Sequence, residues 1–121
     1  MSTLLSQVDA ICSRFPEVNQ RLSHGSPGWF VRDKKNFVML WDGGHHDHDF
    51  PHLWVASSLE EQAALIASNP AVFFRPPYVG HRGWVGVRLD GKVDWAEIGE
   101  LCEEAYRMVA PKTLSARLDR D

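Results

Sequence analysis

The run from Trp84 to Leu89 constrains the fold more than any other part of the sequence, because its apolar residues alternate strictly. Val85, Val87 and Leu89 fall on one side of an extended chain, and the residues between them fall on the other side. This pattern predicts a strand with one face in the core and the other face exposed or used for binding. Because such a strand needs partners, the chain must build a sheet that helices cover on one face.

Three segments have the spacing of amphipathic helices, with apolar residues three and four positions apart. They run from Leu4 to Phe15, from Ser58 to Asn69 and from Asp94 to Val109, and each ends at a proline. Glu61 and Glu97 complete capping boxes at the starts of the second and third helices. The apolar positions expected to face the core are Leu59, Ala63 and Ile66 in the second helix and Ile98, Leu101, Cys102, Ala105 and Val109 in the third.

Four further predictions concern the chain between the helices. Trp29 to Val31 and Phe37 to Trp41 form a hairpin with a charged turn, Leu53 to Ala56 forms a third strand, and Phe73 and Phe74 begin a short edge strand. The stretch from Pro16 to Gly28, rich in proline, glycine and polar residues, is expected to be a loop with one short helical turn.

The length of 121 residues suits one domain, which we expect to span residues 1–121. The element order lacks the alternation of strands and crossover helices that is typical of parallel sheets. We therefore predict an α+β fold of the type α-β(3)-α-β(2)-α, with an antiparallel sheet and helices packed on one face.

The net charge of -3 gives no general attraction to a polyanion, so any nucleic-acid site must be a local patch. Cys12 and Cys102 occupy apolar helical positions and are expected to be buried thiols in a reducing compartment. The N-terminal segment lacks the features of a signal peptide, and no run is long enough to span a membrane. A cytoplasmic location is therefore expected.

The most basic segment runs from Arg75 to Lys92, where four cationic residues and one acid lie among aromatic rings and glycines. Cations interleaved with rings suit phosphate contacts and base stacking, and the turn at Lys34 and Lys35 supplies a second basic hairpin. The candidate nucleic-acid-binding residues are Lys34, Lys35, Arg75, Tyr78, His81, Arg82, Trp84 and Arg88. The alternative is that the rings pack in the core and that the acidic third helix, with five acids and one arginine between Asp94 and Arg107, pairs with the arginines.

The loop from His45 to His52 holds the most unusual local composition, and its potential metal ligands are His45, His46, Asp47, His48, Asp49 and His52. Imidazole and carboxylate groups both bind zinc and nickel ions. However, the loop has no cysteine and no spaced ligand pairs, so a solvated loop with weak metal affinity is the favoured interpretation.

No motif for catalysis is present: the sequence has no nucleophile elbow, no phosphate-binding glycine loop and no readable Cys–His pair. The glutamates at positions 97, 100, 103 and 104 lie opposite the apolar face of their helix and are expected to face solvent. We therefore expect a protein that is not an enzyme and needs no cofactor.

Several segments together resemble the MmcQ/YjbR family of small bacterial proteins. They are FFRPPYVGHRGWVGVRL from Phe73, DWAEIGELCEEAYRMVAPKTL from Asp94, PEVNQRLSHGSPGW from Pro16 and KKNF from Lys34. The loop from Gly43 to Pro51 lies outside the likeness. The resemblance implies the predicted fold and a proposed role in DNA binding through a pair of hairpin wings, without enzymatic activity or a cofactor.

Three functions therefore remain in competition. The first is DNA binding through the basic loops. The second is binding of a small anionic ligand or peptide in a cleft near residues 76–84, built from Tyr78, His81, Arg82, Trp84 and Tyr106. The third is metal binding by the loop at 45–52.

Overall fold

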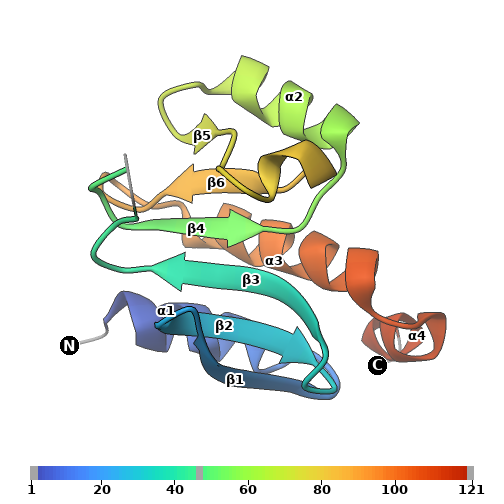
Figure 1. The fold of residues 1–121 in the computed structure, drawn as a ribbon. Helices are drawn as coiled ribbons and strands as arrows, with labels where there is room; N and C mark the ends of the chain where they lie inside the picture. Colours follow the sequence, from blue (N-terminus) through green and yellow to red (C-terminus); the bar gives the residue numbers. More distant parts are fainter. Residues whose placement is uncertain (1–2, 46–47, 120–121) are drawn as a thin grey trace.

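A computed structural model describes residues 3–45 and 48–119 of the chain. Within these residues a six-stranded sheet has the order β1-β2-β3-β4-β6-β5, and every neighbouring pair is antiparallel (Figure 1). The elements are α1 (Leu4–Cys12), β1 (Val18–Ser23), β2 (Ser26–Val31), β3 (Lys35–Trp41), β4 (His52–Val55), α2 (Leu59–Ser68), β5 (Phe73–Phe74), the 3-10 turn η1 (Gly80–Arg82), β6 (Val85–Arg88), α3 (Trp95–Val109) and α4 (Lys112–Leu118). The predicted α+β fold class is confirmed.

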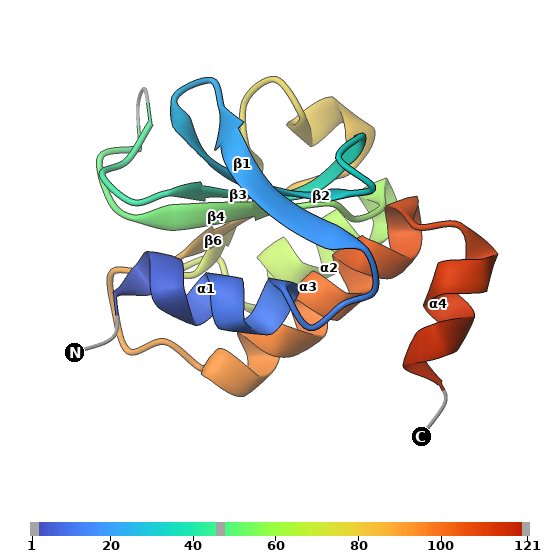
Figure 2. The same ribbon diagram turned by 90° about the horizontal axis from the view of Figure 1, so that it is seen from below.

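Helices α1 and α3 lie on one face of the sheet, and loops rise from the other face (Figure 2). α3 packs on β3 and β4 and also contacts α1, while α2 contacts β5. The core between α3 and the sheet includes the rings of Phe15, Phe37 and Tyr106, with centroids 5.1–6.2 Å apart. We call the face that lacks α1 and α3 the open face.

A β-bulge divides the side chains of β3 between these two faces. Trp29 pairs with Val38 but Phe30 pairs with Asn36, so Phe37 is an extra residue in β3. Phe37 packs against Tyr106 beneath the sheet, whereas Met39 and Trp41 line a cavity on the open face. Without the bulge, alternation would place all three side chains on one face.

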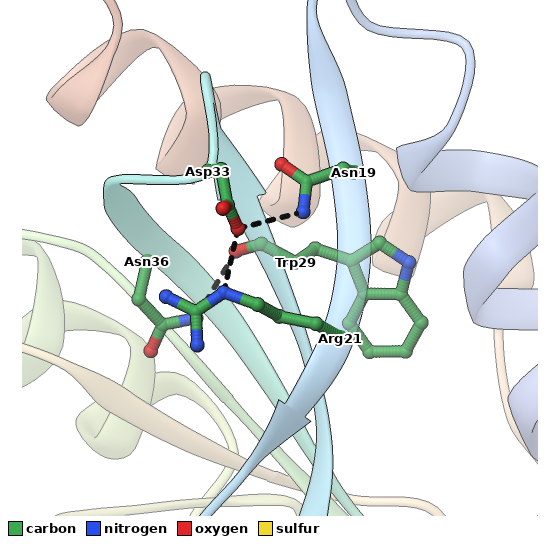
Figure 3. Close-up of polar contacts among 5 residues, drawn as sticks. All are labelled: Asn19, Arg21, Trp29, Asp33 and Asn36. Atoms are coloured by element: carbon green, nitrogen blue, oxygen red, sulfur yellow. Dashed lines mark hydrogen bonds and ion pairs between the residues drawn. The ribbon is translucent and has the colours of Figure 1, made fainter.

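The polar groups around this irregular pairing are satisfied by side chains (Figure 3). Asn36 Nδ2 donates to the carbonyl oxygen of Trp29 at 3.0 Å and to that of Val38 at 3.1 Å. Asp33, in the turn between β2 and β3, accepts from Asn19 at 3.0 Å and from Arg21 at 2.6 Å. These bonds hold β1 against the β2–β3 turn, and they lower the pKa of the Asp33 carboxyl, that from Asn19 having the larger effect.

The structure differs from the sequence-based predictions in three places. The expected loop at Pro16–Gly28 instead contains β1 and the start of β2, joined by a tight turn in which His24 and Gly25 have φ of 53° and 80°. Gly25 lies in the turn, and Pro27 and Gly28 lie in the first half of β2, so residues that usually indicate a loop here belong to a hairpin. Beyond Pro111 the chain forms α4, which was not predicted. The inward face of α2 was also wrong, because Leu59 and Ala63 are exposed and Gln62 is buried.

The other helical predictions are confirmed in part. α1 ends at Cys12 and not at Phe15, whereas Ile98, Cys102 and Ala105 are buried as expected. Of each predicted capping box, only the bond accepted by the N-cap side chain is formed among the described residues. Ser58 and Asp94 cap α2 and α3 by accepting from the backbone N–H groups of Glu61 and Glu97. Cys12 and Cys102 are buried free thiols, and burial is the main cause that raises the pKa of Cys12. Among the described residues, no helix is both long enough and apolar enough to cross a membrane.

Candidate ligand cavity on the open face of the sheet

A cavity of about 720 Å³ lies on the open face, a size typical of small-molecule sites. Segments that are distant in sequence enclose it: strands β3 and β4, the turn between β1 and β2, the loop that holds His45, and the segment before β6. Its lining residues are Ser23, His24, Asn36, Met39, Trp41, His45, Trp54, Tyr78, Val79, Arg82 and Trp84.

Indole rings dominate the cavity. Trp41 from β3 and Trp54 from β4 are only 6% and 5% exposed, and their ring centroids are 4.8 Å apart. Trp84, just before β6, is also 5% exposed. We refer to Met39, Trp41 and Trp54 as the floor, because all three side chains rise from the sheet itself.

Two donors in the floor are unsatisfied. The indole Nε1 atoms of Trp41 and Trp54 are buried and have no hydrogen-bond partner within residues 3–45 and 48–119. An unsatisfied buried donor costs about 1–3 kcal/mol, so native structures seldom retain one without a reason. By contrast, the indole of Trp29 beneath the sheet donates to Asp9 at 3.0 Å.

One wall of the cavity is the segment from Tyr78 to Trp84, which follows Arg75 and which α2 holds in place. Gln62 Nε2 donates to the carbonyl oxygens of Gly80 at 2.8 Å and Trp84 at 2.6 Å. Gly83 has φ of 97°, and a Cβ there would lie 2.6 Å from the Ser58 carbonyl carbon, so only glycine fits this close approach. These constraints place Arg82 and Tyr78 at the cavity.

The cationic groups of this wall are not neutralised by the acidic helix α3. Neither Arg75 nor Arg82 forms an ion pair with any residue that the structure describes. Arg88 pairs with Asp90 at 2.6 Å instead of with a glutamate of α3, and its guanidinium lies 3.9 Å from the Phe50 ring centroid. α3 packs on the opposite face of the sheet (Figure 2), which explains why its acids do not reach the wall.

The structure brings together only part of the predicted site. Tyr78, Arg82 and Trp84 all line the cavity, and Tyr78 is 68% exposed while Trp84 is buried. His81 is exposed but is not a lining residue. Tyr106 is fully buried beneath the sheet, where its hydroxyl donates to the Pro16 carbonyl at 2.8 Å, so its assignment to the ligand cleft was wrong.

Lys34 and Lys35 are exposed in and beside the β2–β3 turn and do not line the cavity. The antiparallel order nevertheless places this turn and Arg82 at the same end of the sheet, because β3 and β6 both start there and β4 lies between them. Arg32, their neighbour, is paired with Glu17 at 2.8 Å.

The sequence favoured a solvated loop, but His45, His48 and His52, the histidines of the loop that the structure describes, contact rings on the open face. His45 and His48 exchange backbone hydrogen bonds of 2.8 Å and 3.0 Å, and His45 lies over the floor with its ring centroid 4.0 Å from that of Trp41. His52 is fully buried. His46 and Asp47 lie outside the described residues. Within the part of the chain that is described, no group of three or more potential ligands is arranged to hold a metal ion.

The floor and Gln62 were missed by sequence reasoning. Phe37 to Trp41 is a continuous apolar run, and a run without alternation does not reveal which residues face which side. A bulge is not visible in such a run, so the sequence does not assign Met39 and Trp41 to either face of the sheet. The one available signal was the count of five tryptophans, which is high for a chain of this length.

Comparison with known proteins gives two findings. A protein-family model described as YjbR matches residues 13–108. The crystal structure of Deinococcus radiodurans protein DR2400, family-model domain DUF419, has a TM-score of 0.73 to this chain at 18% identity, covering 100% of this chain and 91% of that one. At this identity the likeness establishes the fold alone. No curated protein matches the chain.

Proposed function

The chain belongs to the YjbR family, as the resemblance indicated, and from this premise we propose that it is a binding module and not an enzyme. Its ligand is a small, ring-bearing anion that enters the cavity on the open face. The observation that carries this proposal is the cavity itself, in which buried indole rings lie beside an arginine without an ion-pair partner among the described residues.

The chemistry of the lining supports binding over catalysis. None of the described residues that line the cavity is a carboxylate or a cysteine, so the lining offers neither paired carboxylates nor a thiol nucleophile. Aromatic walls with one cationic group suit recognition of an aromatic anion through stacking and a charge-assisted hydrogen bond. Two free buried thiols support a cytoplasmic location, which is reducing.

Isothermal titration calorimetry with naphthoate, an aromatic carboxylate, tests this function. We expect saturable binding at one site per chain, weakened about tenfold in Arg82→Gln because a hydrogen bond to a charged group is lost. Lys112→Gln is the matched control, since it removes an exposed positive charge on α4 and should leave the affinity unchanged. Absence of saturable heat, or equal affinity in the wild type and Arg82→Gln, would refute the proposal.

DNA binding is the second candidate, favoured by the position of the cations. Arg75 and Arg82 and the exposed Lys34 and Lys35 lie toward one end of the sheet, and the acids of α3 are on the other face. Four phosphate contacts predict that log affinity falls with log salt concentration with a slope of about -3 to -4. A DNA titration at two salt concentrations measures this slope, and salt-independent binding would exclude the candidate.

A further inference from the structure

The proposed function does not say which kind of ring the ligand carries. The unsatisfied donors of the floor restrict this choice. Indole Nε1–H groups only donate hydrogen bonds, and those of Trp41 and Trp54 have no acceptor among the described residues. A hydrocarbon ring would leave both donors unpaired. A heterocycle with nitrogen or oxygen acceptors in its plane can pair with them, so the floor favours a heteroaromatic ring over a purely hydrocarbon one.

The chain itself places a nitrogen heterocycle against this floor. The His45 imidazole lies with its centroid 4.0 Å from that of Trp41 and stands edge-on to Trp54 at 5.0 Å. A planar ring of this chemistry therefore fits the surface that the two indoles present. A ligand ring would reach the indole donors by displacing the imidazole.

The charge at the wall favours phosphate over a carboxylate. Arg82 lines the cavity, and Arg75 belongs to the same short segment, with its side chain packed against Gly80. Neither guanidinium has an ion-pair partner in the described chain. Arg82 is placed to bind the anion, and Arg75, which does not line the cavity, adds positive charge to the same segment, so a dianion is favoured over a single negative charge. The floor thus favours a heterocycle and the wall favours a phosphate, and one ligand can carry both groups.

We infer that the cavity binds a nucleotide unit, with the purine or pyrimidine ring on Trp41 and Trp54 and the phosphate at Arg82. This inference rests on the proposed function, because it names the ligand class for the same site. A free mononucleotide and one unstacked nucleotide of a single strand present the same chemistry. Only a strand is long enough to reach Lys34 and Lys35 as well.

Calorimetric titrations with dAMP, deoxyadenosine, ribose 5-phosphate and naphthoate test the inference. We expect dAMP to bind about tenfold or more tightly than each of the other three, because it alone supplies both the heterocycle and the phosphate. Trp54→Phe, which keeps a ring but removes the N–H donor, should weaken dAMP about tenfold and change naphthoate binding less than about threefold. Trp95→Phe on α3 is the matched control and should alter neither affinity.

A short single-stranded oligodeoxyadenylate distinguishes the two sources of the nucleotide. If a strand is the ligand, the oligonucleotide binds more tightly than dAMP, and the double substitution Lys34→Gln and Lys35→Gln removes only that gain. If the free nucleotide is the ligand, the two affinities are equal and the double substitution has no effect.

Two failures can be told apart. If naphthoate binds in an Arg82-dependent manner and dAMP binds no more tightly, the nucleotide inference is overturned and the proposed function stands. If no compound binds saturably, the nucleotide inference and the proposed function are both refuted. Circular dichroism of each variant establishes that a lost affinity does not reflect a lost fold.

Discussion

His52 shows how burial on the open face controls a single side chain. It is fully buried among the rings of His48, Phe50, Trp54 and Phe74. Its Nδ1 lies 2.8 Å from the Phe50 carbonyl oxygen, which can only accept, so the proton sits on Nδ1. Nε2 then has no donor among the described residues. Desolvation is the largest cause that lowers the pKa of His52 below its ordinary 6.5, and nearby His48 and His45 add to it.

This shift predicts a specific loss of stability in mild acid. Because the pKa is lower in the folded chain than in the unfolded chain, the unfolded chain takes up the proton first as the pH falls. The contribution of His52 to the free energy of unfolding is therefore complete above about pH 7 and declines below 6.5. Urea unfolding of His52→Phe should show a shallower decline between pH 7 and 5 than the wild type.

His81 supplies the control for this measurement, because it is exposed and lies outside the histidine loop. His81→Phe should keep the wild-type dependence on pH. Equal slopes in the wild type and His52→Phe would show that His52 does not carry the effect.

Among the elements, α2 shows where sequence patterns stop predicting structure. Its position and its Ser58 cap follow from the sequence, but its apolar periodicity pointed to Leu59 and Ala63 as buried. The structure buries Gln62 instead, since that side chain satisfies the carbonyls of Gly80 and Trp84 in a segment about twenty residues away. A partner supplied by tertiary contact leaves no local signal in the sequence.

Gln62→Leu should therefore destabilise the chain by about 2 kcal/mol or more, because two buried carbonyls lose their donor while the volume is nearly kept. Equilibrium urea unfolding measures the change. Gln20→Leu on the exposed part of β1 is the matched control and should change stability by less than about 0.5 kcal/mol. A Gln62→Leu variant as stable as the wild type would contradict the structural role given to this side chain.

The strands also differ in whether the sequence alone predicts them. β6, β4 and the β2–β3 hairpin were predictable because alternation, β-branched residues and turn residues act locally. β1 was not, because its sequence is mostly polar and its flanking prolines and glycines favour a loop. The bulge at Phe37, which sends Met39 and Trp41 to the open face, depends on pairing with β2 and has no marker in β3 alone.

In the molecule as a whole, the sheet separates the acidic helix α3 and the apolar core on one face from the candidate binding cavity on the other. Beneath the sheet lie α1, the acidic helix α3 and the apolar core, and above it lie the indole floor and Arg82, which has no ion-pair partner among the residues that the structure describes. The sequence identifies the basic, ring-bearing segment but does not reveal whether the acids of α3 neutralise it. Only the fold shows that the cavity is assembled from segments far apart in the sequence and that Tyr106 lies outside it.

The most direct test of the account follows the five indole N–H resonances in a two-dimensional ¹H–¹⁵N spectrum during titration with dAMP or naphthoate. The cavity predicts saturable shifts for Trp41, Trp54 and Trp84. The indole N–H resonances of Trp29, which is bonded to Asp9 beneath the sheet, and of Trp95 on α3 should not shift. Shifts confined to Trp29 or Trp95, or no saturable shift of Trp41 and Trp54, would contradict the claim that the open face is the binding site.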